Sequence, residues 1–391
     1  MNILRVINQF LITLFFLFLL IGCQSEETPP SSDLDLVQYV DSISLPNHLF
    51  IEIDPSTIQS IEKAKKHTVD YITLDPDILA ETFFRNEKMN IETNAFGIQF
   101  RSDNENESLT VYDGGEAFGT ANGVDGGFSY TNDLEHNTLY SRVASLSSDS
   151  PDLNTQLYEY NLNSDFETFI DLDFLPYLDA KKEIKEQLST VGFPEIELDV
   201  VFALDEKMMD IHQERFLEST NDEHELTVFD LSKDDEAYLF FFRQVIDNVP
   251  IINEVWSFDT REAVDPYEPS IMVLYNHNGM VHIDATYLYH ILESTEEFPL
   301  IKEVEALDLI IDHFSSFIIN KQTVIESMEL NYVAVHGENE FELVPSWVFR
   351  LKIDDVYEDP IDHSKHDVHT YDYFVINAIN GERISGVNDK Q

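Results

Sequence analysis

The sequence predicts an α+β fold of tandem antiparallel sheet-plus-helix modules, preceded by a mostly β N-terminal domain. Two segments, at 179–191 and 303–319, show the apolar spacing of an amphipathic helix, and strand-like segments follow each of them. Each series contains an Asn-Gly pair, Asn278-Gly279 or Asn380-Gly381, which is typical of a tight hairpin turn. Because the same order of elements occurs twice, we expect two copies of one unit, each a curled sheet that covers one helix.

The region from 39 to 164 is expected to form an acidic, mostly β domain. Leu49–Ile53 has the composition of a strand, and further strands are expected at 91–100 and 109–112. A short helix is expected at 75–84, with Pro76 in its first turn. The glycine-dense segment at 114–127 predicts a loop.

The first module is expected at 165–295. Asp179 is the expected N-cap of its helix, and Gly192 follows the last apolar residue of the helical pattern. The expected strands of this module are 196–204, 226–231, 237–246, 270–275 and 280–285.

The second module is expected at 296–391. Its helix should turn one apolar face to the sheet, formed by Val304, Leu307, Ile311, Phe314 and Ile318. The strands are expected at 328–336, 341–353 and 371–379, and Asn380-Gly381 turns the chain into 382–384.

The first 22 residues have the pattern of an export signal: a short basic start, an apolar run from 10 to 21, and Gly22 before Cys23. Leu20-Ile21-Gly22-Cys23 resembles a bacterial lipobox, which implies cleavage before Cys23, diacylation of that cysteine and attachment to the cell membrane. Residues 23–38 would then be a polar tether. The alternative is an uncleaved transmembrane anchor over 3–21. Both interpretations place the remaining chain on the extracytoplasmic side.

The charge of the chain excludes nucleic acid as a partner. Acidic residues number 75 and basic residues 23, for a net charge of −52, and removal of Arg5 with the signal gives −52 − 1 = −53. Anionic lipid would also be repelled, so the acyl group would hold the membrane. A hydrophobic content of 43% argues against disorder. Because Cys23 is the only cysteine, the folded part has no disulfide, catalytic thiol or cysteine metal site.

Two motifs carry a family resemblance. Residues 242–251, FRQVIDNVPI, resemble the strand and turn of PepSY and FTP modules, with Asn248 where those families carry glycine. Residues 344–349, VPSWVF, and 373–382, YFVINAINGE, resemble the C-terminal part of the YycI type. That family consists of extracellular regulators of a Gram-positive sensor kinase, built from tandem sheet-and-helix units. YycI-type proteins keep a transmembrane helix, which a cleaved lipobox would remove.

The motif residues are expected to be structural, because they include no nucleophile, base or metal cage. Trp347 and Phe349 share one side of a strand and would pack on the 303–319 helix. Pro345 is expected at a strand start or edge. Arg243 and Gln244 are either ordinary strand residues or hydrogen-bond donors to a ligand chain at a sheet edge. The residues expected to be structural are Pro250, Pro345, Trp347, Asn377 and Gly381.

Two segments are candidate metal sites. His363, His366 and His369 are spaced by three, so one helical turn would bring three imidazoles together, a ligand set suited to zinc. The alternative is a solvated insert. The acidic residues of the glycine loop and its carbonyl oxygens suit Ca²⁺, and the alternative is a plain hairpin loop.

The sequence predicts a protein that is not an enzyme. It has no G-x-S-x-G, no H-E-x-x-H and no S-x-x-K with its partner motifs. We expect a lipoprotein at the cell membrane that binds or regulates an extracytoplasmic protein or peptide through sheet edges. The alternatives are restraint of an extracellular protease, as PepSY-type modules do in propeptides, and capture of a metal or solute.

Overall fold

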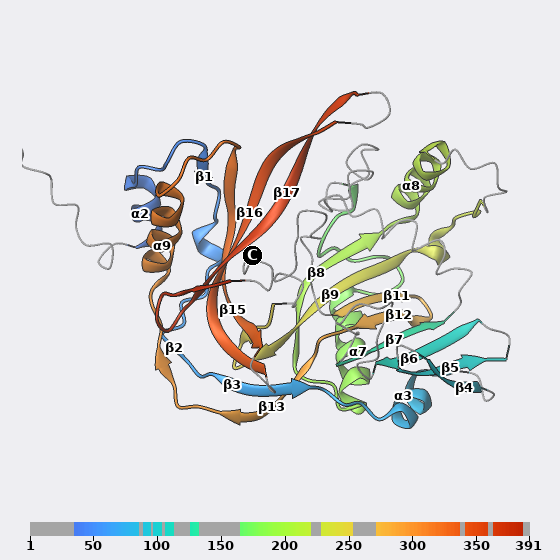
Figure 1. Cartoon of the computed structure of the whole chain (residues 1–391). Coiled ribbons are helices and arrows are strands. Elements are labelled where there is room, and N and C mark those ends of the chain that lie inside the picture. The colour runs from blue at the N-terminus through green and yellow to red at the C-terminus, as the bar shows by residue number, and fades with distance from the viewer. Residues whose placement is uncertain are drawn as a thin grey trace, which may run out of the picture.

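The computed structural model confirms the α+β class and divides the chain into two lobes, each built on one sheet (Figure 1). It describes residues 35–85, 89–94, 97–103, 106–112, 126–132, 165–219, 228–252, 271–336, 341–358 and 363–385. The central lobe comprises the described residues between 72 and 288. The carboxyl lobe comprises 35–71 and 289–385.

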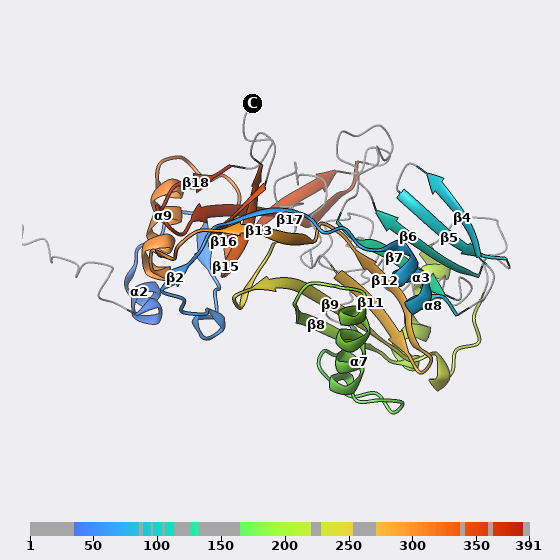
Figure 2. The same ribbon diagram turned by 90° about the horizontal axis from the view of Figure 1, so that it is seen from below.

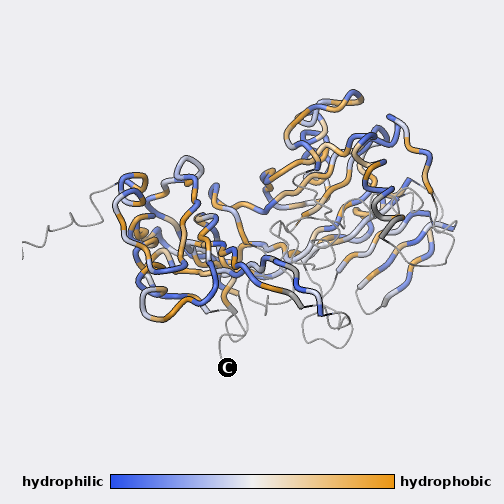
Figure 3. Tube along the Cα trace, turned by 90° about the horizontal axis from the view of Figure 1, so that it is seen from above, coloured by the Kyte–Doolittle hydropathy of each residue, from blue (hydrophilic) through white to orange (hydrophobic). Residues whose placement is uncertain are grey.

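The central lobe contains a nine-stranded antiparallel sheet. In spatial order the strands run β8, β9, β11, β12, β7, β6, β5 and β4, and β10 pairs with the end of β9. Their bounds are β4 Met89–Asn94, β5 Gly97–Ser102, β6 Glu107–Tyr112, β7 Phe128–Asn132, β8 Ile196–Leu204, β9 Ala237–Ile246, β10 Val249–Pro250, β11 Ile271–Asn276 and β12 Gly279–Ala285. Buried and half-buried positions alternate along β6, whereas nearly every position of β9 is buried; Figure 3 shows hydrophobic and hydrophilic residues mixed along the chain of both lobes.

Helices cover both faces of this sheet. α3 (Pro76–Phe83) and α7 (Tyr177–Thr190) belong to the main core, where Ile184 and Leu188 lie in one cluster with Phe240. α8 (Glu206–Ser219) lies over the opposite face, where Met209 is clustered with Phe241. Because Phe240 and Phe241 are consecutive on β9, they point to opposite faces, and the sheet is buried on both sides there.

The carboxyl lobe contains a seven-stranded sheet in which β1 is parallel to β15 and the other pairs are antiparallel. Its strands are β1 Leu49–Ile51, β3 His67–Tyr71, β13 Tyr289–Ser294, β15 Thr323–His336, β16 Phe341–Glu358, β17 Lys365–Asn377 and β18 Arg383–Ile384. The remaining described elements of this lobe are the helices α2 (Leu36–Ser42) and α9 (Glu303–Ser315), the 3-10 turn η2 (Pro55–Thr57) and the small pair β2 (Lys63–Ala64) and β14 (Phe298–Pro299). β3 and β13 pair as a ribbon that links the lobes (Figure 2).

The predicted packing of the second helix is confirmed. Trp347 and Phe349 lie in one buried cluster with Leu307 and Ile311 of α9. The indole nitrogen of Trp347 also donates a hydrogen bond of 3.0 Å to the carbonyl of Ile301, just before α9. Burial of an indole with its polar atom satisfied gives this core a fixed arrangement of helix on sheet.

The N-terminal region is mostly β, as predicted, but its strands lie in two sheets rather than one. β1 and β3 belong to the carboxyl lobe, and β4 to β7 extend the central sheet beyond β12. β3 belongs to the carboxyl lobe because it pairs with β13 on one side and β16 on the other. Its Val69 is buried in the hydrophobic core of that lobe. Residue 165 therefore does not separate two independent sheets.

Several elements differ in detail from those predicted. α8 was not predicted, and 228–231, the described part of the expected strand 226–231, contains no strand. The N-cap of α7 is Pro176, so Asp179 is the third helical residue. α9 ends at Ser315, which leaves Ile318 outside the helix and 85% exposed. α2 begins at Leu36, within the expected tether, because Asp35 caps it and Leu36 and Tyr39 are buried.

Among the described residues, no helix has the length and hydropathy needed to cross a membrane. The apolar segment 3–21 and the lipobox with Cys23 lie outside the described residues.

Candidate functional site

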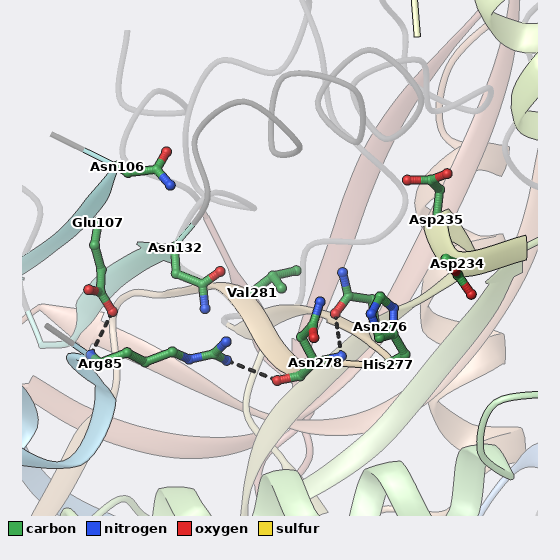
Figure 4. Close-up of a pocket in the computed structure, with 10 residues that line it drawn as sticks. All are labelled: Arg85, Asn106, Glu107, Asn132, Asp234, Asp235, Asn276, His277, Asn278 and Val281. Atoms are coloured by element: carbon green, nitrogen blue, oxygen red, sulfur yellow. Dashed lines mark hydrogen bonds between the residues drawn. The ribbon is translucent and has the colours of Figure 1, made fainter. Parts of the chain in front are cut away.

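A polar pocket of about 390 Å³ opens at one end of the central sheet (Figure 4). The end of α3, the starts of β6 and β12 and the ends of β7 and β11 meet there with the 3-10 turn η3 (Lys233–Asp235). The pocket is lined by Arg85, Asn106, Glu107, Asn132, Asp234, Asp235, Asn276, His277, Asn278 and Val281. Only Val281 is apolar, so hydrogen bonds and charge decide what this pocket can hold.

The floor of the pocket is fixed by internal hydrogen bonds. Arg85 donates from Nη2 to the carbonyls of Asn278 and Met280, at 3.1 and 3.0 Å. Glu107, only 2% exposed, accepts from the Arg85 amide and from the Tyr130 hydroxyl, both at 2.8 Å. These bonds link four segments that are distant in the sequence, so the floor is preorganised rather than assembled by a ligand.

One wall of the pocket is acidic. Asp234 and Asp235 lie on η3, across the pocket from Arg85 and Glu107 in Figure 4. Burial raises the pKa of the neighbouring Glu236, and Asp173 and Asp205 raise it further. Lys233 on the same turn pairs with Asp173 at 2.5 Å. The potential at this wall is therefore negative and favours a cation.

A second polar cluster lies at the junction of the lobes, where the β9–β10 hairpin of the central lobe enters the carboxyl lobe. Asp247 and Asn248 form its turn with φ of 51° and 64°, the two positive values of a type I′ turn. Asparagine tolerates a positive φ, so Asn248 can form this turn where the PepSY and FTP modules that the segment resembles carry glycine. Beyond the turn, Val249 and Ile251 are buried in the core of the carboxyl lobe.

Arg243 is an ion-pairing residue of this junction. Its guanidinium donates to both carboxylate oxygens of Glu329 on β15, at 2.6 and 3.0 Å, and lies 2.9 Å from Asp199 on β8. Burial alone would lower the pKa of Arg243, but the two carboxylates outweigh it and the pKa is raised. A bidentate, partly buried pair of this kind fixes the position of one strand against another.

Gln244 holds the chain that leaves the central lobe. Its Nε2 donates to the carbonyl of Tyr289 at 2.7 Å, and its Oε1 accepts from the Tyr289 amide at 2.9 Å. The side-chain amide therefore pairs with β13 as a neighbouring strand would. The hydrogen-bonding groups expected to meet a ligand at Arg243 and Gln244 have partners within the chain.

The two motif prolines, Pro345 and Pro250, lie within strands of the two sheets. Pro345 lies inside β16 and not at its start. It falls between Leu343, the last residue of β16 that pairs with β3, and Ser346, the first that pairs with β17. The carbonyl of Pro345 accepts a hydrogen bond of 2.9 Å from the Ala378 amide. Proline has no backbone N–H to donate, and at this position neither β3 nor β17 pairs with it as a strand. Pro250 pairs with Val245 in β10.

Asn377 and Gly381 form the turn after β17. The Asn377 side chain accepts from the Ile379 amide at 2.9 Å, and its carbonyl accepts from Gly381 at 2.9 Å. Gly381 has φ of 75°, and a Cβ there would lie 3.2 Å from Leu309 of α9. Both residues are thus required by the turn and its contact with the helix.

The histidine segment does not form a helical turn. β17 begins at Lys365, so positions 366 and 369 belong to a strand paired with β16. The ring Nδ1 of His369 lies 3.1 Å from a carboxylate oxygen of Asp354, and His363 is exposed with φ of 61°. Within the described part of the chain, no three His, Cys, Asp or Glu side chains are grouped to hold a metal ion.

Gly126 and Gly127, the described residues of the glycine loop, are glycines because the backbone packs closely there. A Cβ on Gly127 would lie 1.9 Å from the carbonyl oxygen of Ala285, and Gly126 has φ of 64° beside Leu288. Only glycine permits these backbone contacts. The acids named for calcium, Asp113, Glu116 and Asp125, lie outside the described residues.

Comparisons with known proteins show what this fold is similar to. No family model and no curated protein matches the chain. A crystal structure of an uncharacterized protein from Eubacterium rectale ATCC 33656 is similar, with a TM-score of 0.55 and 15% sequence identity over 87% of this chain and 92% of that one. At this identity the similarity shows the fold alone, and that fold extends over both lobes.

Sequence reasoning missed the pocket. Its asparagines stand at strand ends, at 106, 132, 276 and 278, which is a detectable pattern. The sequence does not reveal that these ends lie side by side, because β7 and β12 pair across about 150 residues, as the Thr131 to His282 register shows.

Proposed function

We propose that this chain is a non-catalytic lipoprotein of the cell envelope, anchored through Cys23, that binds an extracytoplasmic protein or peptide by strand addition at β4. In this mode an extended segment of the partner pairs with an exposed sheet edge through main-chain hydrogen bonds. The supporting observation is the character of β4 compared with four other edge strands, β1, β8, β13 and β18.

Edge strands are normally protected from pairing with other chains. β1 and β18 have three and two residues, and β13 has a register shift between Ile291 and Glu293. The outer edge of β8 accepts hydrogen bonds from the preceding segment, with Phe169 donating to Val201 at 3.1 Å. Each of these edges is therefore short, bulged or covered.

β4 has none of these protections. Its six residues pair with β5 in an unbroken register, and it contains neither lysine nor proline. Positions 90 to 93 are exposed, and Ile91 is 62% exposed. An uninterrupted edge with an exposed β-branched side chain is suited to accept a partner strand.

The charge of the molecule favours a basic partner. With a mature charge of −53, a second copy of the chain would be repelled, whereas a cationic segment would be attracted. We therefore assign β4 to an extended, basic segment of another protein.

The test places a photo-crosslinking amino acid at position 93 in native membranes. The unaltered chain and I318K should give the same cross-linked partner, because Ile318 is exposed but lies away from β4. I91K should lose it, since an edge lysine opposes strand addition. Adducts that persist in I91K, or that disappear equally in both variants, contradict the proposal. The Cys23→Ser chain should move from the membrane to the soluble fraction.

A further inference from the structure

We propose that the pocket beside η3 binds a small zwitterion of amino-acid type, with its ammonium group toward Asp234 and its carboxylate toward Arg85. This site is separate from β4 and does not depend on strand addition. The inference comes from the size of the pocket, the separation of its charges and the state of its floor.

The volume sets the size of the ligand. About 390 Å³ lies within the usual range for small-molecule sites and holds roughly 13 water molecules at about 30 Å³ each. A ligand of about ten non-hydrogen atoms would occupy roughly half of this space and leave room for bridging waters. A folded domain or a long acyl chain would not fit.

The charges are separated across the pocket. The guanidinium of Arg85 lies on one side and the carboxylates of Asp234 and Asp235 on the other (Figure 4). In the described part of the chain, no hydrogen bond or ion pair engages the Asp234 carboxylate, and Asp234 is exposed to the pocket opening. A cationic group would gain a charge-assisted hydrogen bond there.

The same charges exclude other ligand classes. Three carboxylates against one guanidinium disfavour a phosphate or another multiply charged anion. With Val281 as the single apolar lining residue, the pocket offers little to an apolar ligand. A sugar would lack an aromatic ring to stack on. A zwitterion matches both ends.

The hydrogen bonds at the floor of the pocket support this assignment, because they hold Arg85 in place before a ligand binds. The Nη2 atom of Arg85 is committed to two carbonyls, so the guanidinium cannot turn away from the pocket. Asn276 and Asn132 are nearly buried and also bonded to the β11–β12 hairpin, through the Asn278 amide at 2.8 Å and the Met280 carbonyl at 3.3 Å. A ligand would therefore lose little free energy in ordering the site.

The experiment is calorimetry on the chain from residue 23 to the end. L-lysine should bind more tightly than cadaverine, which lacks the carboxylate, and glutarate, which lacks the ammonium, should not bind. Asp234→Asn should weaken L-lysine binding about tenfold or more. Glu296→Gln removes one exposed carboxylate away from the pocket and should leave the affinity unchanged.

The results separate the proposal from its alternatives. Equal loss in D234N and E296Q, or binding of glutarate in preference to L-lysine, overturns it, as does the absence of binding by both L-lysine and Gly-Gly-Lys. The C-terminal residue of the tripeptide keeps the carboxylate and the ε-ammonium of lysine, whereas its α-nitrogen is an uncharged amide, so binding of it alone identifies a peptide end as the source of the zwitterion. Circular dichroism of D234N confirms that an affinity loss does not come from unfolding.

Discussion

His282 should make the stability of the central lobe depend on pH. It lies on β12 opposite Thr131 of β7, whose hydroxyl is 2.7 Å from the ring Nδ1. Burial in the middle of the sheet lowers the pKa of His282 from 6.5 to about 4. The perturbation we choose is His282→Gln, which removes the titrating ring and keeps a side chain able to hydrogen-bond.

The sign follows from the lowered pKa of His282. The folded state binds the proton less readily than the unfolded state, so stability is fully present above pH 6.5 and is lost as pH falls toward 4. The two pKa values differ by 6.5 − 4, about 2.5, which at 1.36 kcal/mol per pH unit limits the loss to about 3.4 kcal/mol. At pH 5 the same linkage gives a loss of about 2 kcal/mol.

Urea unfolding followed by circular dichroism at pH 7.5 and pH 5 measures this loss. The unaltered chain should lose about 2 kcal/mol more than H282Q between the two pH values. Other groups, including Asp284, whose pKa is raised by burial, titrate in both proteins and cancel in the difference. Parallel losses in the two proteins would refute the assignment of the pH dependence to His282.

Two further predictions concern the lobe junction and the histidine segment. Arg243→Met should lower the free energy of unfolding by about 2 kcal/mol, because the partly buried Glu329 and Asp199 lose their partner, whereas Lys321→Met, which breaks a more exposed pair with Asp355, should cost less than about 1 kcal/mol. The two urea midpoints measure this difference, and equal effects would count against a stabilising ion pair at the junction. Zinc titration of the H366A/H369A double variant should match that of the unaltered chain, because both positions belong to β17, and loss of a sub-micromolar affinity would contradict this.

The local elements were predictable where one signal dominates. The apolar segments 196–204 and 237–246 predicted β8 and β9 with their observed bounds, and Pro76 in the first turn predicted α3, which Asp75 caps. α8 escaped because its apolar residues form no clear helical face, although Asp205 caps its first turn through the Met208 amide at 3.1 Å. Propensity and spacing are local, and they fail where tertiary contacts decide.

The distribution of strands between the lobes could not be predicted for the same reason. β3 pairs with β13 and β16, more than 200 residues later, and β1 pairs with β15 in parallel. Nothing in the alternation of a short strand specifies a distant partner. The pocket also depends on long-range strand pairing. The sequence shows its polar residues at the ends of separate strands, but it does not show that those ends lie together.

The junction between the lobes fixes where the two proposed binding features lie relative to the carboxyl lobe. The described chain begins at α2 in the carboxyl lobe, the side from which a lipid tether would enter, whereas β4 and the pocket are both in the central lobe (Figure 1). Arg243, Gln244 and the buried tip of the β9–β10 hairpin join the lobes independently of the β3–β13 ribbon. Because several attachments would have to break together before the lobes could turn, a partner held at β4 would be held in a fixed orientation relative to the carboxyl lobe. The motif that resembles PepSY modules thus supplies the joint between lobes rather than a binding surface.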